Sequence, residues 1–155
     1  MERRTKMNAE SGKQDIKATR EFDLPLELLF KAHVKPEIVE QWMGTKVLKL
    51  ENMKHGSWQF ETTDPQGKVV FRANGVFHEY SPNRKITRTF EMENAPFGVQ
   101  LEFLEFEKLT DETSKLTMHI VYRSAEQRDQ MLKLGMPQGL NMAHNRLQDV
   151  VSKLR

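Results

Sequence analysis

Residues 46–123 repeat one pattern, in which a run of strand-forming residues is followed by a short group of turn-forming residues. Five such groups separate six predicted strands, at approximately residues 46–53, 57–63, 69–80, 85–92, 98–108 and 114–123. The links are too short for the crossover helix that parallel pairing requires. The pattern therefore predicts an antiparallel meander.

A strand and two short helices are predicted before this meander. Apolar and polar residues alternate over residues 15–22, which is the period of a strand with one buried face. Pro25 then precedes apolar residues at helical spacing, and Pro36 begins a similar segment that Gly44 ends. The sequence thus predicts about seven strands in all, interrupted early by two helices.

A long amphipathic helix is predicted at the C-terminal end. Ser124 and Gln127 form a capping-box pattern, and Gly135 with Pro137 breaks the helical stretch that follows it. Beyond the break, one apolar stripe is formed by Leu140, Ala143, Leu147, Val150, Val151 and Leu154. This stripe is expected to face the sheet.

The alternation within two of the predicted strands assigns residues to the inner face of the sheet. These residues are Leu116, Met118, Ile120 and Tyr122 in one strand, and Val99, Leu101 and Phe103 in the other. After Phe103 the phase changes, because Leu104 and Phe106 are apolar and Glu105 is not. The change predicts a β-bulge or a strong bend at this point.

Length and charge limit the domain organisation and the partners. A chain of 155 residues suits one domain with a substantial core. Residues 1–12 are polar and lack periodicity, which predicts a mobile N-terminal tail before a single domain over residues 13–155. The 24 Lys and Arg residues are interspersed with 22 Asp and Glu. This balance gives no concentrated basic face for nucleic acid.

The expected location follows from residues that the sequence lacks. There is no cysteine, which excludes disulfides and thiolate sites and fits a reducing compartment. No segment approaches the roughly 18 consecutive apolar residues of a membrane span. The charged first residues are not followed by the apolar segment of a secretory signal. We therefore expect a cytoplasmic protein, and a monomer.

These elements predict an α+β fold in which a curved antiparallel sheet wraps around the C-terminal helix. A strongly bent sheet of about seven strands encloses more width than one helical stripe can fill. The remaining volume is expected to form an apolar cavity between helix and sheet, with the two short helices closing one end. Cavities that bind small molecules usually measure about 300 to 1,000 Å³.

The chain resembles the START-like, or SRPBCC, superfamily, in the branch named after the C-terminal domain of the heat-shock-protein-90 ATPase activator. The likeness covers about residue 13 to the end. It is carried by residues 20–32, 36–43, 56–60, 75–86, 135–140 and 145–147. The resemblance implies the helix-grip fold and, commonly, binding of lipids or of polyphenol-like and polyketide-like molecules.

Large apolar residues at inward positions are the candidate ligand contacts. The expected cavity lining is Trp42, Phe60, Phe71, Phe90, Phe103, Met118, Leu140 and Ala143. Methionine adapts its shape to irregular ligands, so Met43, Met131 and Met136 are expected near the mouth. The alternative is that each of these residues is ordinary core, with methionine filling gaps.

Polar residues on inward faces are sharper candidates, because a buried polar group is costly unless it is hydrogen-bonded. His144 lies at the edge of the helical stripe and could hold a ligand hydroxyl or carbonyl; the alternative is a solvent-exposed histidine. Arg20 and Arg88 could orient an acidic ligand group, or could form ion pairs with acidic residues such as Glu21 and Glu91.

The sequence contains no recognisable catalytic or metal-binding motif. It has no nucleophile elbow, no glycine-rich phosphate loop and no HExxH pattern among its five histidines. We therefore expect no catalytic residues, no metal and no cofactor, and a protein that binds a small hydrophobic molecule. Two alternatives stay open: a chaperone-associated interaction domain, and a cyclase or hydratase that uses His144 or His119 as acid or base.

Overall fold

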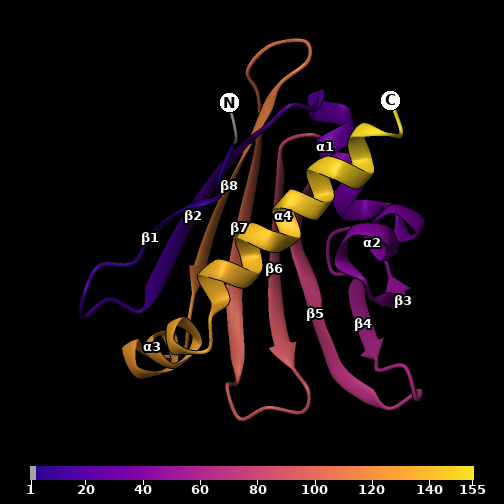
Figure 1. The fold of residues 1–155 in the computed structure, drawn as a ribbon. Helices are drawn as coiled ribbons and strands as arrows, with labels where there is room; N and C mark the ends of the chain where they lie inside the picture. Colours follow the sequence, from indigo (N-terminus) through magenta and orange to yellow (C-terminus); the bar gives the residue numbers. More distant parts are fainter. Residues whose placement is uncertain (1–2) are drawn as a thin grey trace.

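The protein consists of one curved antiparallel sheet and a long helix that crosses its concave face (Figure 1). This computed structural model describes residues 3–155. The strands are β1 (Lys6–Asn8), β2 (Asp15–Phe22), β3 (Lys46–Leu50), β4 (Ser57–Thr63), β5 (Val69–Ser81), β6 (Lys85–Met92), β7 (Val99–Lys108) and β8 (Ser114–Val121). The helices are α1 (Leu26–Val34), α2 (Pro36–Met43), α3 (Ala125–Lys133) and α4 (Met136–Ser152).

The sheet contains eight strands in the order β1-β2-β8-β7-β6-β5-β4-β3. From β3 to β8 each strand pairs with the next one along the chain, so the predicted meander is confirmed. Strand β2 pairs with β8 and closes the curve on the other side. This is the helix-grip arrangement that the sequence predicted.

The short helices α1 and α2 pack at the β3 side of the sheet, beside the C-terminal half of α4 (Figure 1). The left-handed backbone of Gly44, with φ of 65°, ends α2 as predicted. The indole Nε1 of Trp42 donates a hydrogen bond of 2.7 Å to the carbonyl of Ala32 and ties the two helices together. Phe30 of α1 meets Phe106 of β7 edge to face, which anchors the pair on the sheet.

The break between α3 and α4 lies where the sequence predicted it. The Ser124 hydroxyl accepts a hydrogen bond from the backbone N–H of Gln127 and caps α3. Gly135, with φ of 87°, separates the helices. Leu147 and Val151 of the predicted α4 stripe are fully buried in the hydrophobic core.

The first strand was not expected. The sequence predicted a mobile tail over residues 1–12, but Lys6–Asn8 pairs with β2 as strand β1. Met7 packs on the core, and the backbone N–H of Thr5 donates to the side chain of Asn141 in α4. Residues 1–2 of the predicted tail lie outside the described residues.

The predicted facing of β7 is wrong. Glu102, Leu104 and Phe106 are buried on the concave face, whereas Phe103 lies on the convex face and stacks on His119. The register between β7 and β8 is continuous from Leu101 to Lys108, so there is no bulge after Phe103. The apparent change of phase arises because polar residues of β7 face inward.

Candidate functional site

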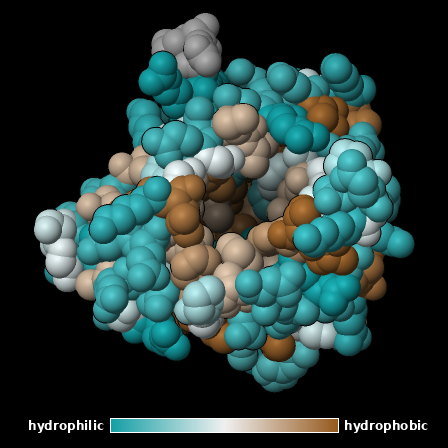
Figure 2. All heavy atoms as spheres, turned by 60° about the horizontal axis from the view of Figure 1, so that its bottom comes forward, coloured by the Kyte–Doolittle hydropathy of each residue, from teal (hydrophilic) through white to brown (hydrophobic). Residues whose placement is uncertain are grey.

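A cavity of about 220 Å³ lies between the concave face of the sheet and the N-terminal half of α4. An apolar cavity of about 150 Å³ is large enough to hold benzene. Figure 2 shows a hollow with hydrophobic walls and a mainly hydrophilic rim in the part of the surface that lies toward the bottom of Figure 1. The cavity therefore has room for a ring-sized molecule and a route to solvent.

Apart from Met131, nine of the eleven residues that were predicted to contact the ligand line this cavity. They are Trp42, Met43, Phe60, Phe90, Met118, Met136, Leu140, Ala143 and His144. Met131 of α3, also expected near the mouth, lines it as well. These residues come from α2, α3, α4 and three strands, so only the folded chain brings them together.

Phe71 and Phe103 are the two predicted residues that do not line the cavity. Phe71 is half-buried and packs near Phe90, with 6.5 Å between ring centroids. Phe103 borders a depression on the convex face with Lys17 and Thr117. It lies there because the adjacent residues 102 and 104 are the ones that face inward in β7.

The floor of the cavity carries an ion pair. Arg88 of β6 and Glu102 of β7 are cross-strand partners, and the Nε of Arg88 donates a hydrogen bond of 2.9 Å to Oε1 of Glu102. The amide of Gln100 donates to the other carboxylate oxygen at 2.8 Å. The Arg88 guanidinium also lies 5.4 Å from the ring of Trp58, a cation–π contact that supports it.

Several lining residues were missed by sequence reasoning as site residues. They are His33, Arg88, Met92, Gln100, Glu102, Leu104, Ile120 and Tyr122. Arg88 had been singled out as an inward polar residue, but with a different acidic partner. A signal for Gln100 and Glu102 was present, because they share the phase of Leu104 and Phe106 in an unbroken strand.

Both histidines of the cavity wall are held neutral. Burial, together with the smaller effects of the nearby His33 and Arg20, lowers the pKa of His144 to about 3. Burial likewise lowers the pKa of His33 to about 4, against a hydrogen bond to the Leu29 carbonyl that favours the charged ring. His144 is thus a buried residue of α4, and Nδ1 contacts the hydroxyl of Thr5 at 2.6 Å.

Arg20 is buried but does not line the cavity. Nη1 of Arg20 donates a hydrogen bond of 2.8 Å to Asn145 of α4, and the guanidinium lies 5.2 Å from the ring of Phe22. It therefore joins β2 to α4, and neither Glu21 nor Glu91 is its partner in these contacts.

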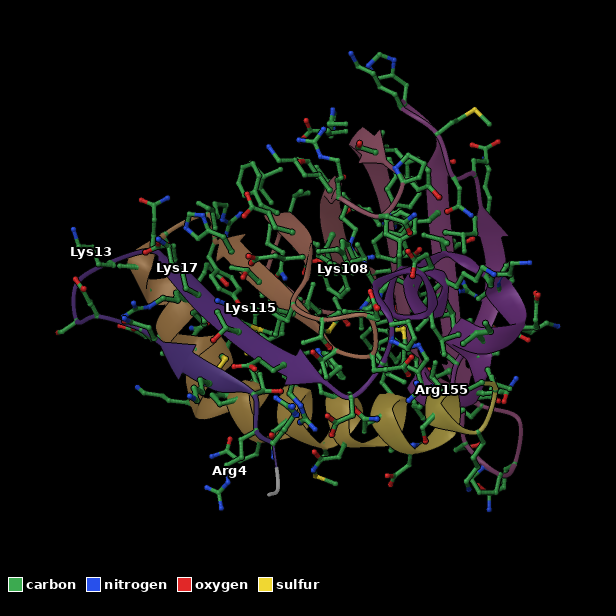
Figure 3. All side chains as sticks on the ribbon, turned by 90° about the horizontal axis from the view of Figure 1, so that it is seen from above. Arg4, Lys13, Lys17, Lys108, Lys115 and Arg155 are labelled. Atoms are coloured by element: carbon green, nitrogen blue, oxygen red, sulfur yellow. The ribbon has the colours of Figure 1, made fainter. Side chains whose placement is uncertain are left out.

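A polar groove of about 340 Å³ beside β1 and β2 is a weaker candidate. Its walls include Arg3, Arg4 and Lys115, but Arg3 is already paired with Glu21 and Asp23. Figure 3 shows the labelled basic side chains spread across the molecule, with Arg4, Lys13 and Arg155 far apart.

No three His, Asp or Glu side chains among residues 3–155 gather closely enough to hold a metal ion. No helix of this range is both long and apolar enough to cross a membrane.

Solved structures with the same fold come from several bacteria. Protein Ms6760 from Mycobacterium smegmatis has a TM-score of 0.82 at 18% identity, over 94% of this chain and 95% of that one. A protein from Rhodobacter sphaeroides has a TM-score of 0.85 at 19% identity, over 96% and 99%. A protein from Arthrobacter aurescens has a TM-score of 0.84 at 19% identity, over 96% of this chain and 91% of that one. At these identities the likeness establishes the fold alone.

A search of curated proteins finds no match. Residues 23–152 match the family described as activator of Hsp90 ATPase homolog 1-like protein. That range contains α1, the whole meander and α4, which together build the cavity. The fold and this match show that the chain belongs to the activator of Hsp90 ATPase homolog 1-like family of the START-like superfamily.

Proposed function

We propose that this protein binds a small hydrophobic molecule in the cavity between the sheet and α4. The observation that carries the proposal is the cavity of about 220 Å³, whose lining is dominated by aromatic, aliphatic and methionine side chains. Sites of this kind bind small molecules through apolar walls and a few placed polar groups. Arg88, Glu102 and Gln100 supply such groups here.

The size of the cavity favours a compact ligand. A molecule of one or two rings, of the polyphenol or polyketide type, suits the volume better than a long acyl chain. Met43, Met131 and Met136 can change rotamer at the wall, so a range of ring shapes is accommodated.

The state of the histidines favours binding over catalysis. A histidine with a pKa of about 3 is a weak base at neutral pH, and Nδ1 of His144 is already engaged by Thr5. His119 lies on the convex face, where its Nε2 contacts Asp15 at 2.7 Å. The cyclase or hydratase alternative therefore lacks the well-placed histidine acid or base on which it depends.

A chaperone-associated role is the second candidate, favoured by the description of the matching family. It is tested by adding the protein to the ATPase assay of an Hsp90 from the same organism. A stimulation that saturates with protein concentration would support this role, and an unchanged ATPase rate would exclude stimulation.

We also propose a cytoplasmic location and a monomeric state. The cysteine-free composition suits a reducing compartment. Cell fractionation and size-exclusion chromatography with light scattering test the two statements.

The binding proposal is tested by extracting small molecules from purified protein and identifying them by mass spectrometry. Ala143→Phe places a ring inside the cavity, whereas Met142→Phe changes the exposed neighbouring residue of α4 and serves as the matched control. We expect a compound that co-purifies with the wild type and the control, and is lost from Ala143→Phe. Equal recovery from all three proteins would overturn the proposal.

A further inference from the structure

We infer that Arg88 is the polar anchor of the cavity, and that the ligand is an uncharged molecule whose carbonyl oxygen accepts hydrogen bonds from it. This inference rests on the proposed binding function and adds to it the chemical class of the ligand.

Arg88 is held in place through only part of its guanidinium. Its Nε donates to Glu102, and the second oxygen of Glu102 is taken by Gln100, so the carboxylate is satisfied on both sides. Among residues 3–155, no group accepts a hydrogen bond from Nη1 or Nη2 of Arg88. The fixed side chain therefore presents donors without acceptors to the cavity that it lines.

Stability alone does not explain this arrangement. A buried ion pair is often replaced by apolar residues without loss of stability, because desolvation offsets the attraction. Glu102 has 6% of its side-chain surface exposed and Arg88 has 15%, so both charges are largely withdrawn from water. An ion pair in an otherwise mainly apolar wall is better explained by recognition of a polar atom of the ligand.

The cavity wall has no net charge, which favours an uncharged ligand. Arg88 and Glu102 cancel, and the other two ionisable groups that are positive when protonated, His33 and His144, are neutral at pH 7. A carboxylate in the cavity would leave one negative charge uncompensated in a poorly hydrated site. A ketone, ester or quinone oxygen accepts the same hydrogen bonds without that penalty.

Tyr122 adds a second donor that lacks an acceptor. It lines the same cavity, and among the described residues its buried hydroxyl has no hydrogen-bond partner. Buried polar groups are almost always satisfied, so the unmatched hydroxyl in this lining is consistent with an oxygen acceptor that the lining residues do not supply.

The test compares three probes of one shape by calorimetric titration of the full chain: 2-acetylnaphthalene, 2-ethylnaphthalene and 2-naphthoate. We expect the ketone to bind about tenfold more tightly than the hydrocarbon, the effect of a hydrogen bond to a charged donor. The carboxylate should bind more weakly than the ketone.

Two double variants test whether Arg88 causes the preference. Arg88→Met with Glu102→Met removes the ion pair without leaving a lone charge, and should abolish the advantage of the ketone while the hydrocarbon still binds. Arg72→Met with Glu61→Met removes a cross-strand pair outside the cavity and should leave the advantage unchanged.

Each failure has its own signature. Equal binding of ketone and hydrocarbon to the wild type, or an unchanged preference in the Arg88 double variant, would overturn the role of Arg88 alone. Tightest binding of 2-naphthoate would overturn the uncharged ligand. Absence of binding by all three probes would overturn the proposed function itself, and this inference with it.

Discussion

The hydroxyl oxygen of Thr5 lies 2.6 Å from Nδ1 of His144, so the chain just before β1 is bonded to the helix that covers the sheet. The same histidine ring lines the cavity and meets Phe22 edge to face at 5.5 Å. His144 therefore connects three parts of the molecule: the N-terminal segment, the edge of the sheet and the cavity wall.

Thr5→Val is expected to destabilise the protein by about 1 to 3 kcal/mol. The substitution keeps the shape of the side chain but leaves the buried Nδ1 of His144 without its partner. Urea unfolding measures the change. Thr63→Val is the control, because Thr63 is exposed and forms no side-chain hydrogen bond among the described residues. Equal stability of the two variants would contradict the role of this contact.

Stability is expected to fall as the pH drops below about 6.5, because of His144 and His33. Their pKa values in the folded protein are about 3 and about 4, whereas the unfolded chain takes up protons near the ordinary value of 6.5. Above 6.5 both states are neutral and the full stability is present. Between 6.5 and 4 the unfolded state binds more protons, so each ring contributes a slope of up to about 1.4 kcal/mol per pH unit.

Urea titrations at pH 7, 6 and 5 measure this slope. His144→Gln should reduce it by about half, since one of the two buried rings is removed. His78→Gln changes an exposed histidine and should leave the slope as in the wild type. A stability that is independent of pH over this range would show that the rings are not buried neutral.

The order of the elements could be predicted because local chemistry determines where each one begins and ends. Ser124 caps α3, and Gly44 and Gly135 adopt the left-handed backbone that ends or separates helices. Strand β1 could not be predicted in this way. Lys6–Asn8 is ordered by the edge of β2, and the adjoining Thr5 by Asn141 and His144, contacts that lie far along the chain.

The apolar part of the site could be predicted, and its polar part could not. Inward residues of β8 alternate with outward ones, and the apolar stripe of α4 repeats at helical spacing. Met118, Leu140 and Ala143 could therefore be predicted as lining residues. In β7 the expectation that polar residues face solvent fails, because Gln100 and Glu102 face the cavity. That failure placed Phe103 on the wrong face. Departures from patterning of this kind are expected where a site requires buried polar groups.

Gly75→Ala is expected to destabilise the protein by about 3 kcal/mol or more. A Cβ atom at Gly75 would lie 1.9 Å from the Thr89 carbonyl oxygen and 2.5 Å from Nε1 of Trp58, so backbone would have to move. Gly139→Ala is the matched control, since nothing lies within 4 Å of its Cβ position inside α4. That change should stabilise by about 0.5 to 1 kcal/mol. Thermal unfolding that ranks the two variants in the opposite order would refute the close approach.

Breaking the Arg88–Glu102 pair on one side is expected to cost more than removing it. Arg88→Met leaves the Glu102 carboxylate buried without its cation, which should destabilise by about 3 to 5 kcal/mol. The double change with Glu102→Met should restore stability to near the wild-type value, because no buried charge is left. Urea unfolding of the singles and the double forms a complete cycle, and additive effects would indicate that the two groups do not interact.

Tyr122→Phe is expected to leave the free energy of unfolding unchanged or to raise it by up to about 1 kcal/mol. The hydroxyl that it removes is buried and forms no hydrogen bond within residues 3–155, so the folded state gives up no interaction. Burial and the nearby Glu102 charge raise the pKa of this phenol well above its ordinary value, which keeps it a hydrogen-bond donor at neutral pH.

The effect of this change on binding should be selective. Tyr122→Phe removes a secondary donor from the cavity wall, so the affinity for 2-acetylnaphthalene should fall by about two- to threefold, less than on loss of Arg88, while the affinity for 2-ethylnaphthalene stays the same. Tyr80→Phe alters the other tyrosine of the chain, which lies outside the cavity, and should affect neither probe. A loss of stability in Tyr122→Phe would instead mean that the hydroxyl forms a hydrogen bond in the folded protein, for example with a buried water. A buried hydroxyl without a hydrogen-bond partner does not stabilise the fold.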